Sequence, residues 1–118
     1  MNTFKEFLRS GLRNSWITSG TYGIYVRRGH HSVNGQITSC FDLANVINTD
    51  EEARGKGQFW TLVKDMQDAI KDEPFIDGIF VESVQNPQLC ESLAKRGFSP
   101  VERSLPPSFY LPKNHECK

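Results

Sequence analysis

The chain has 118 residues, of which 14 are Lys or Arg and 14 are Asp or Glu, so its formal net charge at neutral pH is zero. This length supports one hydrophobic core, and we expect a single domain over residues 1–118. A balanced charge gives no reason to expect nucleic acid or an anionic membrane as the partner. The start of the chain lacks the apolar segment of a signal peptide and no run approaches the ~18 apolar residues of a membrane span, so we expect a cytoplasmic protein.

The cysteines add one further restriction. Cys40, Cys90 and Cys117 are odd in number, and no two of them are separated as metal ligands usually are. This pattern predicts buried packing thiols rather than a disulfide framework, a zinc site or a nucleophile.

The first third of the chain predicts a helix and a hairpin. Thr3 and Glu6 form a capping box, which predicts a helix that starts at Phe4 and fades near Asn14. Alternating apolar residues predict one strand over residues 22–28 and a second from residue 37 onward. Between them, Asn34-Gly35 is a strong signal for a two-residue hairpin turn. The two strands should therefore pair antiparallel.

The second predicted strand changes its pattern near its end. Its apolar side chains occupy odd positions up to Leu43 and then appear at Ala44 and Val46. One extra residue in the ladder, a β-bulge, produces such a switch. A strand that becomes buried on both faces would also produce it, and this alternative stays open.

A polar loop over residues 51–58 then leads into the strongest helical pattern in the chain. The apolar residues of that helix are Phe59, Leu62, Val63, Met66, Ala69 and Ile70. Unpaired backbone N–H groups at a helix start favour an anion, and Arg54 and Lys56 add positive charge. No hydroxyl residue follows Lys56, which a Walker loop requires, and Trp60 holds the place of the third glycine of a dinucleotide loop. We interpret the loop as a phosphate cradle of another kind, or as a basic helix start that binds nothing.

The last third predicts a buried strand, a helix and two closing strands. Residues 75–81 are a short apolar run after a proline, which is typical of a central strand. Asn86-Pro87 is a helix start, and Gly97 is typical of a helix end. Residues 98–103 and 108–111 can form the closing strands.

Two of these segments resemble the GCN5-related N-acetyltransferase (GNAT) superfamily. The loop from Arg54 through Gly57 to Phe59 is similar to the family's Arg/Gln-x-x-Gly-x-Gly/Ala motif, with Phe59 in place of the last small residue. The second segment contains Asn86, Lys95, Gly97 and Phe98, which match an asparagine that contacts the cofactor and a helix that ends in Lys-x-Gly-Phe. The resemblance spans residues 43–98 and looks like a minimal or truncated member without the family's first strand.

The resemblance implies the fold class, the cofactor and its site. The fold would be α/β, of the mixed α+β kind, with a mixed, mostly antiparallel sheet of five or six strands flanked by three helices. The cofactor would be acetyl-CoA and the partner an amine acceptor, either a small molecule or a protein. The implied cofactor contacts are Val46, Ile47, Asn48, Arg54, Gly55, Lys56, Gly57, Gln58, Phe59 and Asn86. Separately from the resemblance, Trp16, Trp60 and the Phe109-Tyr110 pair could form an acceptor surface, or could belong to the core or to a homodimer contact.

Acetyl transfer requires a base, because an amine must be neutral before it attacks a thioester. Asp42, just before the predicted bulge, and Glu82, at the end of the buried strand, are the catalytic candidates. His30 and His31, which we expect in the hairpin loop, are alternatives. Many family members protonate the departing thiolate with a tyrosine four residues before the Gly-Phe pair, and Leu93 stands there. A second hypothesis is therefore a non-catalytic GNAT-fold interaction domain with a vestigial or CoA-binding-only site.

Overall fold

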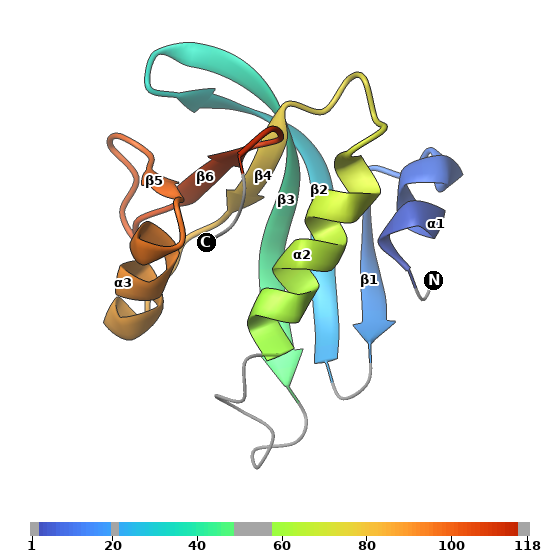
Figure 1. Ribbon diagram of the computed structural model, residues 1–118, viewed down its shortest axis with the longest axis horizontal. Coiled ribbons are helices and arrows are strands. Elements are labelled where there is room, and N and C mark those ends of the chain that lie inside the picture. Colours follow the sequence, from blue (N-terminus) through green and yellow to red (C-terminus); the bar gives the residue numbers. More distant parts are fainter. Residues whose placement is uncertain (1–2, 20–21, 49–57, 116–118) are drawn as a thin grey trace.

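The computed structural model describes residues 3–19, 22–48 and 58–115. Its helices and strands are, in chain order, α1 (Phe4–Ser10), β1 (Asn14–Ser19), β2 (Tyr22–Val33), β3 (Gln36–Asn48), α2 (Gln58–Ile70), β4 (Gly78–Val81), α3 (Pro87–Lys95), β5 (Ser99–Pro100) and β6 (Phe109–Pro112). The strands form one six-stranded sheet in the order β1-β2-β3-β4-β6-β5, shown in Figure 1. Strands β3 and β4 pair in parallel, and the other pairs of described neighbours are antiparallel. The predicted mixed, mostly antiparallel architecture is confirmed.

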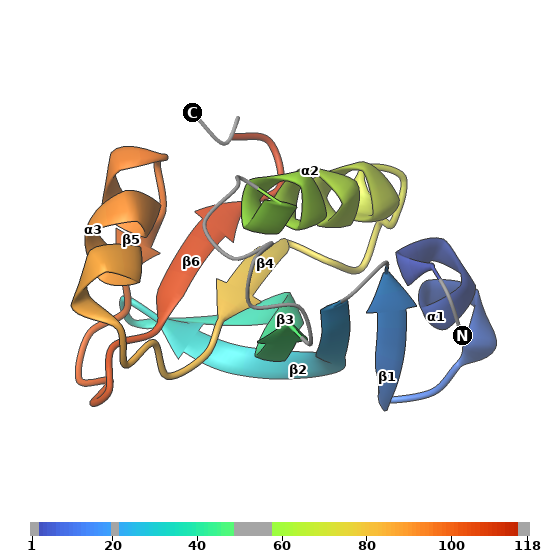
Figure 2. The same cartoon turned by 90° about the horizontal axis from the view of Figure 1, so that it is seen from below.

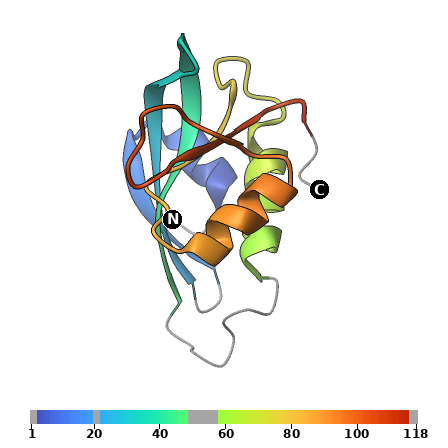
Figure 3. The same ribbon diagram turned by 90° about the vertical axis from the view of Figure 1, so that its left-hand side faces the viewer.

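All three helices lie on the same face of the sheet, which is visible when the molecule is turned (Figures 2 and 3). The main core lies between that face and the helices, and it includes Phe7 and Leu8 of α1, Ile24 and Val26 of β2, Phe41 and Leu43 of β3, and Val63 and Met66 of α2. We call the opposite side the helix-free face. No helix in the described residues is long and apolar enough to cross a membrane.

Helix α1 is shorter than predicted. Its capping box forms, with the Thr3 hydroxyl accepting from the Glu6 N–H, but the helix ends at Ser10 because Gly11 adopts the left-handed conformation with φ of 77°. The guanidinium of Arg28, on β2, donates to the carbonyls of Phe7, at 3.2 Å, and Leu8. These bonds satisfy helix-end carbonyls that have no partner inside the helix.

Strand β1 is not predicted by the sequence pattern. Asn14, which we had assigned to the end of the helix, begins an edge strand that pairs with β2. Ile17 is fully buried and its neighbour Trp16 is half exposed. An edge strand with so few apolar residues lacks the alternation from which a strand is predicted.

The hairpin is confirmed, and its strands are longer than predicted. Asn34 and Gly35 have φ angles of 50° and 92°, as a type I′ turn requires, and Val33 lies opposite Gln36. Because β2 continues to Val33, His30 and His31 are strand residues, and their predicted place in a loop is wrong.

The bulge in β3 is also confirmed. Val26 lies opposite Leu43, whereas the preceding residue Tyr25 lies opposite Asn45. Ala44 is therefore the extra residue, at the position where the apolar pattern changes.

The second half follows the prediction with two corrections. The first closing strand, predicted over residues 98–103, is only Ser99–Pro100. Strand β4 begins at Gly78 rather than residue 75, and Phe75 lies 84% exposed in the loop before it. Helix α3 has the predicted ends: the Asn86 side chain accepts from the Gln88 N–H at 2.9 Å, Pro87 is in the first turn, and Gly97 has a φ of 100°.

Candidate active site

A cleft opens where β3 and β4 diverge. The two strands pair over four residues, from Cys40 opposite Gly78 to Leu43 opposite Val81, and the last bond of the ladder runs from the Glu82 N–H to the Leu43 carbonyl at 3.1 Å. The bulge at Ala44 then bends β3. Strand β4 ends beside it, and the next turn departs from the sheet.

Ser83 redirects the chain after β4. Its φ of 47° lies in the left-handed region, which a residue with a Cβ rarely adopts. The Ser83 N–H donates to the hydroxyl of Ser108 at 3.0 Å, and the Val84 N–H donates to the Pro107 carbonyl at 2.7 Å. These bonds hold the turn away from β3 and keep the cleft open.

The cleft has a volume of about 550 Å³. Its walls come from β3 after the bulge, the turn after β4, and the first turns of α2 and α3. The lining residues are Leu43, Ala44, Asn45, Val46, Phe59, Val81, Glu82, Ser83, Val84, Gln85, Asn86 and Leu89. Such a volume is ordinary for a small-molecule or cofactor site.

Three of the predicted cofactor residues line this cleft: Val46, Phe59 and Asn86. Ile47 and Asn48 continue β3 beyond Val46, and Gln58 begins α2, although their side chains are not described. The loop residues Arg54, Gly55, Lys56 and Gly57 lie outside the described residues. The structure therefore places three of the predicted cofactor residues around one cavity.

The α2 wall of the cleft is bulky. Phe59 stands at the motif position that is small in most GNAT sequences, and its ring contacts that of Trp60 edge-on, with 5.0 Å between centroids. The guanidinium of Arg96 lies 4.0 Å from the centre of the Trp60 ring. A bulky Phe59 narrows the cleft at the helix end.

Leu93, in contrast, lies in the core. Its side chain is fully buried and is not among the residues that line the cleft. The position from which a family tyrosine would donate a proton therefore faces the interior, because α3 turns its apolar side toward the sheet.

Asp42, one of the two predicted bases, is buried on the helix-free face. Only 2% of the residue is exposed, and its Oδ2 lies 2.7 Å from Nε2 of His31. The His31 ring stacks on Phe80 of β4, with 3.8 Å between centroids and 3° between planes. The sequence analysis named His31 and Asp42 separately and did not predict their contact.

Glu82, the other predicted base, lies beside Asp42 and forms an ion pair with Arg27 of β2. Arg27 and Asp42 are directly opposite each other in the β2–β3 ladder, so all three side chains share the helix-free face. One oxygen of each carboxylate, Asp42 Oδ1 and Glu82 Oε2, is buried without a hydrogen-bond partner among the described residues. The structure thus brings the two candidate bases together; Glu82 also lines the cleft, whereas the buried Asp42 does not.

The surroundings perturb the acidity of this group. Burial and, to a smaller extent, the negative charge of Glu82 raise the pKa of Asp42 to about 7, against the opposing effects of His31 and Arg27. A carboxyl group with a pKa near neutrality suits a general base. The hydrogen bond to Glu82 raises the pKa of Arg27, so this guanidinium stays charged.

Burial also makes two neighbouring groups inert. It raises the pKa of Cys40 to about 12 and that of Tyr110 to about 12. Cys40 is therefore a packing thiol, as predicted, and Cys90 lies with its Sγ 3.6 Å from the Val84 carbonyl.

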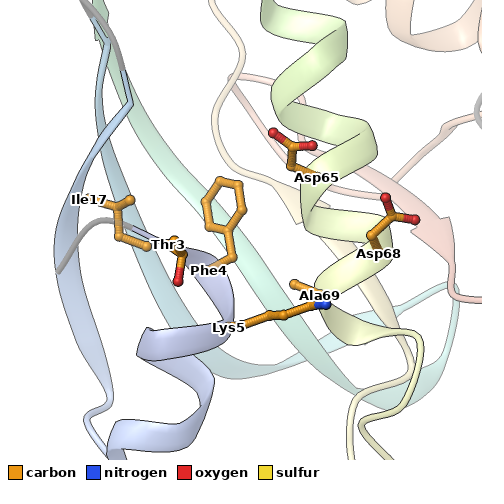
Figure 4. Close-up of a pocket in the computed structure, with 7 residues that line it drawn as sticks. All are labelled: Thr3, Phe4, Lys5, Ile17, Asp65, Asp68 and Ala69. Atoms are coloured by element: carbon orange, nitrogen blue, oxygen red, sulfur yellow. The ribbon is translucent and has the colours of Figure 1, made fainter.

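A second hollow, of about 390 Å³, lies between α1 and α2. Figure 4 shows Phe4 and Ile17 at its base and Asp65 and Asp68 on α2. Its acidic side chains are exposed, so water already solvates them. None of the residues that line this hollow has a buried polar atom without a partner, whereas Glu82, which lines the β3–β4 cleft, has one.

Comparison with known proteins identifies the fold. No protein-family model and no curated protein matches the sequence. Among solved structures, the chain is similar to AtaT complexed with acetyl-methionyl-tRNAfMet, with a TM-score of 0.67 and 15% identity over 91% of this chain and 79% of that one. The fold is that of the GNAT acetyltransferases, as the two motifs had implied.

Two other structures support this conclusion. One is a mutant AtaT toxin bound to the C-terminus of the antitoxin AtaR and acetyl-CoA, with a TM-score of 0.64 and 18% identity over 79% of this chain. The chain spans only 59% of that protein's length. The other is the KacTA–DNA complex, with a TM-score of 0.64 and 18% identity over 92% of this chain and 73% of that one. The charge balance gave no reason to expect nucleic acid, yet two of these three neighbours were solved with it.

Proposed function

We propose that this protein binds acetyl-CoA in the β3–β4 cleft and transfers the acetyl group to an amine acceptor. The observation that carries the proposal is the cleft itself: a bulged strand and a diverging strand enclose a cavity, Glu82 lines it, and the buried Asp42 lies beside Glu82. The GNAT fold agrees with this chemistry, and one neighbour of the same fold was solved with acetyl-CoA.

The cofactor would lie along the free edge of β3. Beyond the bulge, Asn45 and Val46 pair with β2 on one side, and they line the cleft on the other. Backbone N–H and C=O groups on an unpaired strand edge can hydrogen-bond the amides of an extended chain such as pantetheine. The pyrophosphate would bind the loop over residues 51–57, at the start of α2, where Arg54 and Lys56 supply positive charge.

The carboxylates would act on the acceptor. An ammonium group gives one proton to Asp42 or Glu82, and the neutral amine attacks the carbonyl carbon of the thioester. The nitrogen, positively charged after the attack, gives its second proton to water, the carbon–sulfur bond breaks, the thiolate leaves, and the amide retains the acetyl group. Since Leu93 supplies no acid, the thiolate takes its proton from water. We expect a slow enzyme for this reason.

The acceptor could be any of several classes of amine. An amine on a small molecule or a protein fits the two carboxylates. AtaT was solved with acetyl-methionyl-tRNAfMet, so the α-amine of an aminoacyl-tRNA also belongs in the acceptor panel.

Binding of acetyl-CoA provides the first test. At a hundredfold excess over its dissociation constant, acetyl-CoA should stabilise the fold by roughly 2–3 kcal/mol, seen as a raised melting temperature and a bound mass in native spectra. Leu89→Trp, which fills the cleft, should weaken binding at least tenfold. Leu105→Trp is the matched control, because Leu105 is 94% exposed and lies outside the cleft. Equal affinity in both variants would place the cofactor elsewhere.

The loop has its own test. Gly57→Val should also weaken acetyl-CoA binding at least tenfold with an unchanged circular dichroism spectrum, because a side chain there keeps the pyrophosphate from the backbone. Unaltered affinity in this folded variant would show that the loop is not the cradle.

The second candidate function is a non-catalytic GNAT-fold interaction domain. Two observations favour it: Phe59 narrows the cleft, and the acid position is occupied by the buried Leu93. Free thiol release from acetyl-CoA across the acceptor panel separates the two functions. Cofactor binding without thiol release on any acceptor would support a CoA-binding-only site, and no binding at all would support a vestigial one.

A further inference from the structure

Packing and a hydrogen bond hold His31 and Asp42 in place. The His31 ring lies flat on Phe80, so its orientation is fixed by packing. Its Nε2 lies 2.7 Å from Asp42 Oδ2, which is the length of a strong hydrogen bond. His31 of β2 and Phe80 of β4 therefore act together around the carboxyl group of Asp42 on β3.

Gly29 makes room for this pair. Gly29 lies on β2 between Arg27 and His31, on the same face of the sheet. A Cβ added at Gly29 would lie 2.9 Å from Asp42 Oδ2 and 3.2 Å from His31 Nε2. Any larger residue would push the two polar atoms out of their places.

The hydrogen bond leaves one specific oxygen free. Asp42 Oδ2 is bound to His31, and Oδ1 is buried without a partner in the described residues, as is Oε2 of Glu82. Buried acceptors without donors are rare and costly, so this arrangement suits a site that receives N–H donors from a ligand. An ammonium group has three such donors, enough for both oxygens.

We propose that His31 is a positioning residue for Asp42: by donating its Nε2–H to Oδ2, it fixes the carboxylate with Oδ1 left free to accept from the acceptor amine and keeps it ionised, ready to take the proton. This inference rests on the proposed acetyl transfer and names the group that prepares its base. The proton of the ammonium passes to Asp42 Oδ1, and the nitrogen keeps its electron pair for the attack on the thioester.

The charges around Asp42 determine the sign of the pH effect. Arg27 and His31 of β2 face it, with Glu82 after β4 and Cys40 on its own strand. Burial favours the neutral acid, and the His31 hydrogen bond favours the carboxylate. Loss of that bond should therefore raise the pKa of Asp42, and activity that needs the carboxylate should shift to higher pH.

The test compares two variants of His31. His31→Phe keeps a ring over Phe80 and removes the donor, whereas His31→Gln keeps a neutral donor. In His31→Phe we expect the acid limb of the kcat/KM profile to move up by about one pH unit, with a roughly tenfold loss at pH 6 and a much smaller loss on the alkaline plateau. His31→Gln should recover most of the loss. Equal shifts in both variants, or a shift in neither, would overturn the proposal.

A second measurement does not depend on activity. The titration of the Asp42 carboxyl carbon, followed by NMR, should move to higher pH in His31→Phe and much less in His31→Gln. Gly29→Ala should move it too, since the added methyl displaces the pair, and Ile37→Ala is a control at an exposed residue of the same hairpin. An unmoved titration in His31→Phe overturns the pair's role. A protein that shows the NMR shift but no transfer on any acceptor instead overturns the proposed function.

Discussion

The two faces of the sheet contain different kinds of residue, although they share the same strands. On the helix side, β3 presents Phe41 and Leu43 to a continuous apolar core. On the helix-free face, the same strand presents Asp42, with His31 and Arg27 beside it. The alternation of a strand lets one segment stabilise the fold with one set of side chains and build a polar site with the other. Substitutions in adjacent residues of β3 should therefore have opposite effects.

The largest effect is expected on the helix side. Phe41 is fully buried, and its ring centroid lies 5.7 Å from that of Phe4 and 5.8 Å from that of Phe7. Phe41→Ala leaves a cavity and should lower the free energy of unfolding by ~3–5 kcal/mol, measured by urea denaturation. A loss below ~1 kcal/mol would mean that Phe41 contributes little to the stability of the core, and that the helix side does not stabilise the fold more than the helix-free face does.

The neighbouring residue should change stability in the other direction. The pKa of Asp42 is raised in the folded state, so its contribution to stability is greatest below the unfolded value near 4 and is lost as pH rises through about 7. Asp42→Asn avoids burial of the charge and should raise the free energy of unfolding at pH 8 by ~1–2 kcal/mol. The gain should shrink below pH 5, and acetyl transfer should be lost. Equal gains at pH 4 and pH 8 would exclude the ionised carboxylate as the cause.

Asn86 should show a smaller effect. Its side chain caps α3 by accepting from the Gln88 N–H, and Asn86→Ala should cost ~1 kcal/mol in urea denaturation. Asn86→Asp retains the cap and separates this role from cofactor contact. If only the alanine variant loses acetyl-CoA affinity, Asn86 contributes to binding by capping α3 and not by contacting the cofactor.

The smallest effect is expected at the rim of the helix-free face. Arg27 pairs with Glu82, but its side chain is 44% exposed, so water and salt weaken the pair. Arg27→Gln should change stability by less than ~1 kcal/mol. We expect a larger change in the KM for the acceptor, because Glu82 loses the partner that orients it. A stability loss of 2 kcal/mol or more would show that Arg27 belongs to the core.

Local patterns predicted the features that depend on neighbouring residues. The Asn34-Gly35 turn, the bulge at Ala44 and both ends of α3 follow from backbone preferences or from side-chain alternation over a few residues. Phe75 was wrongly assigned to a strand because the prediction assumed that every apolar residue of the run is buried, whereas the Phe75 side chain is exposed. Strand β1 was missed because an edge strand buries few side chains.

The pair of His31 and Asp42 could have been found with one further step. A two-residue turn at Asn34-Gly35 fixes the register, so Arg27 must face Asp42, and His31 must lie on the same side. The turn alone does not determine the rotamer that brings His31 to Asp42, which depends on Phe80 from a strand that is distant in sequence. Contacts between residues of the parallel strands β3 and β4 cannot be predicted from patterns in neighbouring residues of the sequence.

The short parallel ladder between β3 and β4 also has a consequence for folding. One side of it is a meander of neighbouring strands, and the other side is completed only after the chain has passed through α2. Contacts distant in sequence form late because a longer loop must close first. We therefore expect β1, β2 and β3 to form earlier in folding than β4, β6 and β5. The cleft lies between these two groups of strands, so a ligand that fills it would stabilise their contact. Amide hydrogen exchange of β4 and β6 should slow when the cleft is occupied, while that of the β2–β3 turn should not.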